Sequence, residues 1–208
     1  MKGIDVSVYQ PNIDWPTVAA SGVAFCMIQL TQGTGIVNPI EHDQSVKAKS
    51  AGIKIGYYHF GHPHIDDARA EARCFIAQIR RMDIPTADII PAVDVEWCYD
   101  ANGRQLSVPA GTLEGWVNDF ADEMAQAGFP QIIVYTNAFF VKQSLPANHS
   151  LSRFPLWQAA YQNTEPAPAP GWSSILIWQY NGKDTVPGIP EPCDTNVCTG
   201  DLPLLINS

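Results

Sequence analysis

The chain has 208 residues, which is enough to bury one sizeable core, and barrel folds of this length are commonly single domains. Its composition is 46% hydrophobic and 16% charged, which excludes a disordered chain. The net charge of −9 disfavours nucleic acid as a partner, because such binding needs a basic face. No stretch approaches the roughly 20 apolar residues of a membrane span, so we expect no stable membrane insertion.

The amino terminus, Met1-Lys2-Gly3-Ile4-Asp5, enters a strand directly, without the apolar segment of a secretion signal. We therefore expect a chain that is made without a Sec signal. We also expect a monomer. The five cysteines are an odd number, so at least one thiol is free. Cys193 and Cys198 flank a short segment and could form a disulfide; two reduced thiols are the equal alternative.

Strand-like and helix-like segments alternate along the chain. Strands are expected at residues 4–8, 24–30, 53–60, 89–93, 132–136, 154–159 and 175–180, and helices at 15–21, 41–51, 65–82 and 112–127. Helices become short or missing towards the end, where the Pro-rich segment 165–171 is expected to be a rigid surface loop. The pattern predicts the α/β class and a modified (β/α) TIM-like barrel of parallel strands, formed by residues 1–208 as one domain.

Two carboxylates end the apolar run 89–93. Asp94 and Glu96 are two residues apart, so they share one face of a strand, with backbones about 6.6 Å apart. That is near the spacing at which paired carboxylates flank a glycosidic bond, and barrel enzymes place their chemistry at the carboxyl ends of strands. Asp5, on the first strand, is a further candidate acid. A purely structural role for such a pair remains open at this point.

Aromatic side chains accompany these acids at the expected strand ends. Tyr58, Tyr135, Trp157 and Tyr180 could pack on sugar rings, whereas a phosphate site would require glycine-rich turns and basic side chains. Trp178, in the middle of a strand, is expected to fill the core. The crowded histidines His59, His62 and His64 match no standard metal-ligand spacing, so we expect no metal and no cofactor, and a packing or hydrogen-bonding role for His59.

Nine short segments together resemble the Chalaropsis-type lysozymes, glycoside hydrolase family 25, over nearly the whole chain. In chain order they are Gly3-Ile4-Asp5-Val6-Ser7 with Tyr9-Gln10, Ile13-Asp14-Trp15, Gly56-Tyr57-Tyr58-His59-Phe60, Val93-Asp94-Val95-Glu96, Ile133-Val134-Tyr135-Thr136-Asn137, Leu156-Trp157 with Tyr161, Ile177-Trp178-Gln179-Tyr180, Val186-Pro187-Gly188-Ile189 and Asp194-Thr195-Asn196. The resemblance implies a muramidase that cuts the β-1,4 bond between N-acetylmuramic acid and N-acetylglucosamine, with peptidoglycan glycan strands as its partner.

The resemblance also assigns roles to residues. The family's acids fall on Asp5, Asp94, Glu96 and Asp194. We also expect Tyr58, Tyr135, Trp157, Gln179 and Tyr180 to bind the substrate. Glu96 is the expected general acid, with a pKa raised by the neighbouring carboxylates. Asp94 would act as a nucleophile, as a base for water, or by orienting the 2-acetamido group of the substrate; the spacing does not choose among these.

Some features depart from the family pattern or leave alternatives open. Gln32 stands where the family often has Glu, and an amide cannot exchange a proton near neutral pH. A chitinase-like barrel is the second hypothesis, although Ala92 replaces an acid of its motif. A third is an inactive glycan-binding barrel, which would not call for four acids in one pocket. A single-module chain without a leader fits a phage endolysin released through a lysis pore, or an effector delivered by a secretion machine.

Overall fold

The computed structural model describes residues 1–82, 86–100, 102–108 and 111–205, and eight of its strands close into a barrel. The strands follow the order β1-β11-β10-β9-β8-β5-β4-β2, and β1 pairs with β2 to close the ring. Their bounds are β1 (Lys2–Val6), β2 (Phe25–Gln32), β4 (Lys54–Phe60), β5 (Ala92–Asp94), β8 (Ile133–Asn137), β9 (Leu156–Ala159), β10 (Ile177–Asp184) and β11 (Cys193–Cys198). The predicted modified β/α barrel is confirmed.

One strand corrects the prediction of an all-parallel barrel. β11 runs antiparallel to both of its neighbours, β10 and β1, whereas the other barrel pairings are parallel. A parallel connection needs a crossover of a dozen or more residues, usually a helix, but only residues 185–192 separate β10 from β11. The chain therefore turns back as a hairpin, and Asp194 pairs directly with Asp5.

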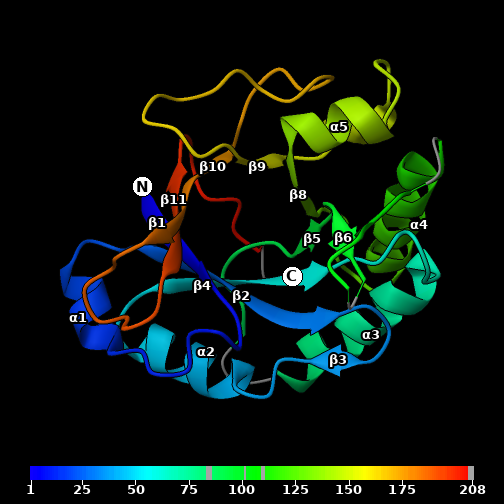
Figure 1. Cartoon of the computed structure of the whole chain (residues 1–208). Helices are drawn as coiled ribbons and strands as arrows, with labels where there is room; N and C mark the ends of the chain where they lie inside the picture. Colours follow the sequence, from blue (N-terminus) through cyan, green and yellow to red (C-terminus); the bar gives the residue numbers. More distant parts are fainter. Residues whose placement is uncertain (83–85, 101, 109–110, 206–208) are drawn as a thin grey trace.

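The helices are distributed unevenly around the barrel. They are α1 (Trp15–Ala20), α2 (Glu41–Ser50), α3 (Ala68–Arg81), α4 (Thr112–Gln126), α5 (Ala138–Ser144) and the 3₁₀ helix η1 (Ser150–Arg153). Figure 1 shows α1 to α4 outside the strands, while an irregular loop joins β9 to β10. The expected shortage of helices in the C-terminal part is confirmed. In the described residues, no helix is both long and apolar enough to cross a bilayer.

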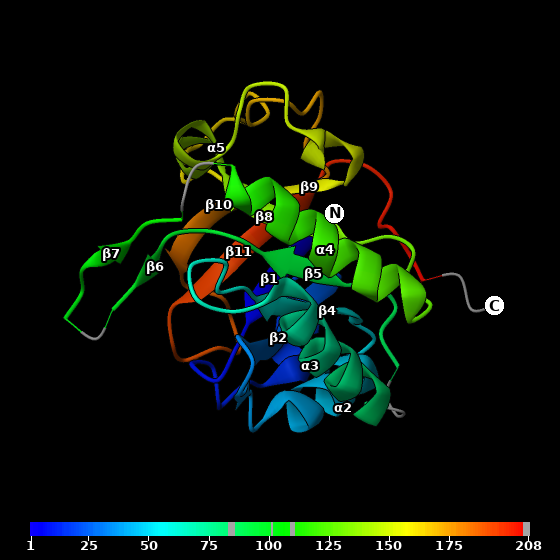
Figure 2. The same ribbon diagram turned by 90° about the vertical axis from the view of Figure 1, so that its right-hand side faces the viewer.

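Two short additions lie outside the ring. β3 (Ile36–Val37) pairs with the end of β2, and the hairpin of β6 (Cys98–Tyr99) and β7 (Gln105–Leu106) extends away from the barrel in Figure 2. Because β6 follows Glu96 by one residue, this hairpin leaves the barrel beside the candidate catalytic acid.

The core has two layers, as alternation along each strand requires. Inward-facing residues such as Met27, Ile133 and Trp157 fill the barrel, and outward-facing residues such as Ile28 and Val134 pack beneath the helices. A Cβ atom at Gly56 would come within 2.9 Å of the Ile89 Cβ atom, which is fixed to the backbone, so the tightly packed interior favours glycine there. Packing therefore closes the inside of the barrel beneath its carboxyl end.

The possible Cys193–Cys198 disulfide is contradicted by the structure. Both thiols are free, and the two residues stand at opposite ends of β11. Five steps along a strand separate their Cα atoms by about 17 Å, whereas a disulfide requires less than about 7 Å. The alternative of two reduced thiols is the one that the structure supports, because residues 193–198 form an extended strand. Strand pairing, not a disulfide, holds Asp194 in place.

Candidate active site

A cleft of about 330 Å³ opens at the carboxyl ends of the barrel strands. Its walls contain all four predicted acids together with aromatic and amide side chains. The lining residues are Asp5, Ser7, Tyr9, Gln29, Gln32, Tyr58, Phe60, Asp94, Glu96, Tyr135, Trp157, Gln179 and Asp194. The structure therefore brings together residues from both ends of the chain, because β1 and β11 are neighbours in the closed barrel.

Asp5 is a buried carboxylate held by two amides. Its Oδ2 accepts hydrogen bonds from Gln179 Nε2 at 2.9 Å and from Asn196 Nδ2 at 2.7 Å. Burial raises the pKa of Asp5, and these two hydrogen bonds oppose that rise. Two amide donors on one oxygen favour the ionised carboxylate. Asp5 thus provides a fixed negative charge at the base of the cleft.

Aromatic donors fix the orientation of both amides. The Gln179 Oε1 atom accepts from the Tyr135 hydroxyl at 2.9 Å and from the Tyr161 hydroxyl at 3.1 Å. The Asn196 Oδ1 atom accepts from Trp157 Nε1 at 2.8 Å. Each carbonyl is therefore occupied, so each amide N–H must point at Asp5. Sequence reasoning did not assign Asn196 this role, since it depends on the direction of β11.

Asp194 lies beside Asp5 and differs from it in protonation. Burial and the charge of Asp5 raise the pKa of Asp194 to about 8, and a hydrogen bond with Asp5 acts in the same direction. At neutral pH Asp194 therefore holds a proton that it donates to Asp5. The pair carries one negative charge rather than two, which makes their proximity tolerable.

Asp94 ends β5 and is buried, with its Oδ1 atom unpartnered within the described residues. Burial raises its pKa well above the ordinary value, and Glu96, Asp5 and Asp194 raise it further. Glu96 follows two residues later and is partly buried. Burial, and then the charge of Asp5, raises the pKa of Glu96 to about 7. Glu96 therefore carries a proton over the acidic half of the physiological range.

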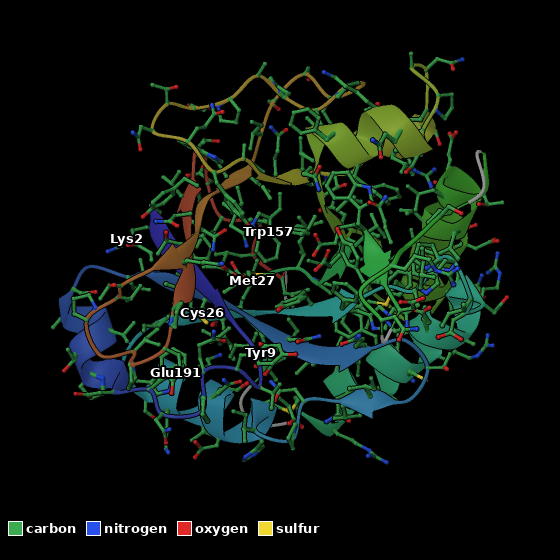
Figure 3. The ribbon with its side chains drawn as sticks, viewed as in Figure 1. Lys2, Tyr9, Cys26, Met27, Trp157 and Glu191 are labelled. Atoms are coloured by element: carbon green, nitrogen blue, oxygen red, sulfur yellow. The ribbon has the colours of Figure 1, made fainter. Side chains whose placement is uncertain are left out.

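The aromatic walls differ in what they offer to a ligand. Trp157 is 1% exposed and packs edge-on against Tyr58 and Tyr135, with ring centroids 5.9 and 4.8 Å away, so it forms the floor of the cleft. Tyr9 is 77% exposed at the rim, on the loop after β1 (Figure 3). Sequence analysis did not place Tyr9 in the site, although it lies four residues after Asp5.

The structure does not support the prediction that Tyr180 belongs to the substrate-binding residues. It does not line the cleft, and its ring packs edge-on against Trp178 with centroids 5.7 Å apart. Adjacent residues of a strand point to opposite faces, so the inward position of Gln179 places Tyr180 outside. Trp178 is buried, as expected, and its indole N–H donates to the Ala160 carbonyl at 2.8 Å.

The histidines lie behind or beside the cleft. His59 is buried, with Nε2 2.6 Å from Glu71 Oε2 and Nδ1 2.7 Å from the Thr31 hydroxyl. The expected hydrogen-bonding role of His59 is confirmed. Gln32 lines the cleft and its Nε2 contacts His62 Nε2 at 3.1 Å. Among the described residues, no group of three or more His, Cys, Asp or Glu side chains is placed to hold a metal ion.

Comparison with known proteins identifies relatives over nearly the whole chain. Lysozyme M1 of Streptomyces globisporus is 25% identical over 99% of this chain and 70% of its own length. The autolytic lysozyme of Clostridium acetobutylicum is 31% identical over 93% of this chain and 54% of its own length. The N,O-diacetylmuramidase of Chalaropsis sp. is 27% identical over 86% of this chain and 87% of its own length.

Solved structures and a family model agree with these relatives. The crystal structure of a lysozyme from Streptomyces coelicolor has a TM-score of 0.85 and 26% identity, covering 96% of this chain and 92% of its own. A muramidase from Acremonium alcalophilum has a TM-score of 0.80 and 27% identity, covering 97% of this chain and 94% of its own. The model of glycosyl hydrolases family 25 matches residues 4–189. This barrel, with its acids gathered at the strand ends, belongs to glycosyl hydrolase family 25.

Proposed function

We propose that this enzyme is a muramidase that hydrolyses the β-1,4 bond between N-acetylmuramic acid and N-acetylglucosamine in peptidoglycan. The observation that carries the proposal is the proton-bearing Glu96 in one cleft with the ionised Asp5 and the buried Asp94. Family membership and relatives described as lysozymes and an N,O-diacetylmuramidase support the same activity.

In the proposed reaction, Glu96 is the general acid. It donates its proton to the glycosidic oxygen as the bond to the anomeric carbon breaks, and that carbon gains positive charge. A pKa of about 7 suits this role, because the acid holds its proton near neutral pH and still releases it readily.

Asp94 is the group proposed to stabilise the sugar cation. Asp94 lines the cleft, and its Oδ1 atom, although buried, has no hydrogen-bond partner among the described residues. A carboxyl oxygen that no protein group engages fits attack on the anomeric carbon, activation of water and orientation of the 2-acetamido group alike. The negative charge that Asp5 retains also favours a positive sugar ring.

Asp194 and the surrounding side chains complete the proposed site. Asp194 is proposed to hold Asp5 through their shared proton, and Gln179 to orient Asp5 through its amide. Tyr58, Tyr135 and Trp157 are proposed to pack against the sugar bound next to the acids. All these residues come from one chain, so a monomer contains a complete cleft. The glycan strands of the bacterial cell wall are the proposed partner.

Digestion of purified peptidoglycan tests the bond that is cut. Mass spectrometry of the soluble products should show new reducing ends of N-acetylmuramic acid. The Glu96→Gln variant, which keeps the size of the side chain but has no exchangeable acid proton, should release almost none of them. Products with reducing N-acetylglucosamine, or free stem peptides, would contradict the proposal.

A further inference from the structure

A cavity of about 510 Å³ lies at the end of the barrel opposite to the acid cleft, the cleft that contains the four acids. It is formed by the segments that precede β9 and β10 and by the segment that follows the antiparallel strand β11. Within the described chain, none of its lining residues also lines the acid cleft. They are Ser152, Arg153, Phe154, Pro155, Leu156, Trp172, Ser173, Ser174, Ile175, Leu176, Thr199, Gly200 and Pro203.

We propose that this cavity, the rear pocket, is a second binding site for peptidoglycan, in which Arg153 binds a carboxylate of a stem peptide. The choice of ligand rests on the proposed muramidase function, because the polymer that such an enzyme digests carries these peptides on its muramic acid residues. The rear pocket holds the enzyme on the polymer and takes no part in bond cleavage.

Arg153 gives the rear pocket a positive charge that its own walls do not neutralise. The described residues that line it include no Asp and no Glu, although the whole chain has a net charge of −9. The guanidinium donates through Nη2 to Asn118 Oδ1, a neutral acceptor, at 3.0 Å. Arginine has five N–H donors, so others remain for a ligand. A planar carboxylate accepts two parallel hydrogen bonds from such a group.

Contacts within the protein already hold Arg153 in place. Its guanidinium carbon lies 4.6 Å from the centroid of the Phe154 ring. Asn118, its hydrogen-bond partner on α4, is fixed in turn because its Nδ2 atom donates to Ser150 Oγ at 3.1 Å. A side chain restrained in this way loses less freedom when a ligand binds. Arg153 is therefore preorganised for an anion.

The other walls suit a short peptide. Trp172 is half-buried, and its indole N–H donates to the Phe154 carbonyl at 2.9 Å, which fixes the ring. This aromatic wall and the apolar residues beside it can accept the methyl groups of the alanines in a stem peptide. The exposed serines Ser152, Ser173 and Ser174 supply hydroxyl groups for peptide N–H and C=O groups. The cavity is also within the size range of small-ligand sites.

The position of the rear pocket separates holding from cutting. Barrel enzymes keep their chemistry at the carboxyl ends of the strands, whereas this cavity lies at the amino ends. Two sites on opposite faces can bind different chains of a cross-linked polymer, and the second binding event is then intramolecular. The rear pocket should therefore matter on insoluble cell walls and not on soluble glycans.

A titration of ¹⁵N-labelled wild-type protein tests the site directly. The probe is a stem tetrapeptide without sugar, made of alanine, D-glutamate, lysine and D-alanine. Two indole N–H groups report the two sites, because Trp172 lines the rear pocket and Trp157 forms the floor of the acid cleft. The peptide should shift the Trp172 signal and leave the Trp157 signal unchanged. Amidation of its carboxylates should abolish the shift.

Matched arginine variants show whether the charge in the pocket is responsible. Arg153→Ala should weaken peptide binding about tenfold, the factor that about 1.4 kcal/mol represents. Arg80→Ala is the control, since Arg80 is also exposed and donates to a neutral oxygen, the Ala127 carbonyl, but lies on α3 outside the pocket. It should bind like wild type. Arg153→Ala should also digest insoluble cell walls several times more slowly, with an unchanged rate on soluble glycan strands freed of peptides.

Several results would overturn the inference: a peptide that shifts neither indole or only Trp157, equal affinity of Arg153→Ala and wild type, or undiminished binding of the amidated peptide. A glycerol phosphate polymer that shifts Trp172 where the peptide does not would also overturn it, because the rear pocket would then be a phosphate site. Failure of the proposed function looks different. A wild-type protein that binds the peptide at Trp172 but releases no reducing N-acetylmuramic acid would keep the peptide site and refute the muramidase.

Discussion

Two glutamates in this molecule share a perturbed pKa but occupy different surroundings. Burial is the main cause in both, and it raises the pKa of Glu71 and that of Glu96 to about 7. Glu71, on α3, is 0% exposed and meets His59 Nε2 at 2.6 Å. Glu96 follows β5 and lines the acid cleft. Among the groups that shift its pKa, the charged neighbour is another acid, Asp5.

The comparison teaches that a shifted pKa does not by itself mark a catalytic group. The buried carboxyl of Glu71 is matched by partners: the His62 amide donates to both of its oxygens at 3.1 and 3.2 Å, and His59 is neutral because burial lowers its pKa to about 3. Glu96, in contrast, lines the open cleft that contains the four acids. Access to a cavity, which Glu96 has and the fully buried Glu71 lacks, separates the catalytic carboxyl from the structural one.

Of the substitutions considered, replacing Glu71, the structural one of the two glutamates, should have the largest effect on stability. Glu71→Ala leaves His59 Nε2 and the His62 amide without their partner, and each unpaired buried group costs about 1–3 kcal/mol of unfolding free energy. Urea denaturation measures the loss. Glu71→Gln, which keeps the size and can still pair, should lose much less. Similar stability of the alanine variant and wild type would show that Glu71 is not structural.

Removing the carboxyl group of Asp94 should instead increase the free energy of unfolding. The folded-state pKa of Asp94 lies above its unfolded value, so at pH 7 folding is opposed by the ionisation of Asp94, and Asp94→Asn removes that opposition. We expect a gain of about 1 kcal/mol, or about 2–4 °C in Tm for a chain of this size. The gain should vanish near pH 3, where Asp94 is protonated in both states. Destabilisation at pH 7 would contradict this assignment.

The smallest expected effect is a shift in the pH profile. Activity should fall as the pH rises through about 7, where Glu96 loses its proton. Asp5 raises the pKa of Glu96, so Asp5→Asn should move this alkaline limb to lower pH by a fraction of a unit, besides lowering the rate. Profiles of kcat/KM against pH measure the shift. Movement to higher pH would show that Asp5 does not act on Glu96 through its charge.

Local patterns in the sequence were sufficient to predict much of the fold. Apolar runs separated by amphipathic segments predicted the strand and helix alternation, and Asp94 and Glu96 were recognisable because they end such a run. Asp5 was a candidate acid from its place on the first strand, and Asp194 was named from the family resemblance. Their direct pairing, however, depends on the closure of the barrel.

The other parts of the fold and of the site depend on contacts between distant segments, which local sequence patterns do not reveal. The segment of β11 has few apolar residues, so it was not predicted as a strand and its antiparallel pairing with β10 was missed. The position of Asn196 beside Asp5 and the separation of Cys193 from Cys198 both follow from that pairing and were therefore not predicted. Tyr180 was placed wrongly for a different reason. Strand alternation already implies that Gln179 and Tyr180 cannot both face the cleft.

The central claim is that Glu96 is the catalytic acid and Glu71 is not, and a matched pair of amides tests it most directly. Initial rates on purified peptidoglycan should be measured for Glu96→Gln and Glu71→Gln at equal concentrations of folded protein, verified by circular dichroism. Glu96→Gln should lose roughly 10²–10⁴-fold in rate, while Glu71→Gln stays close to wild type. A folded Glu96→Gln enzyme with a near wild-type rate, or an equal loss in both variants, would contradict the claim.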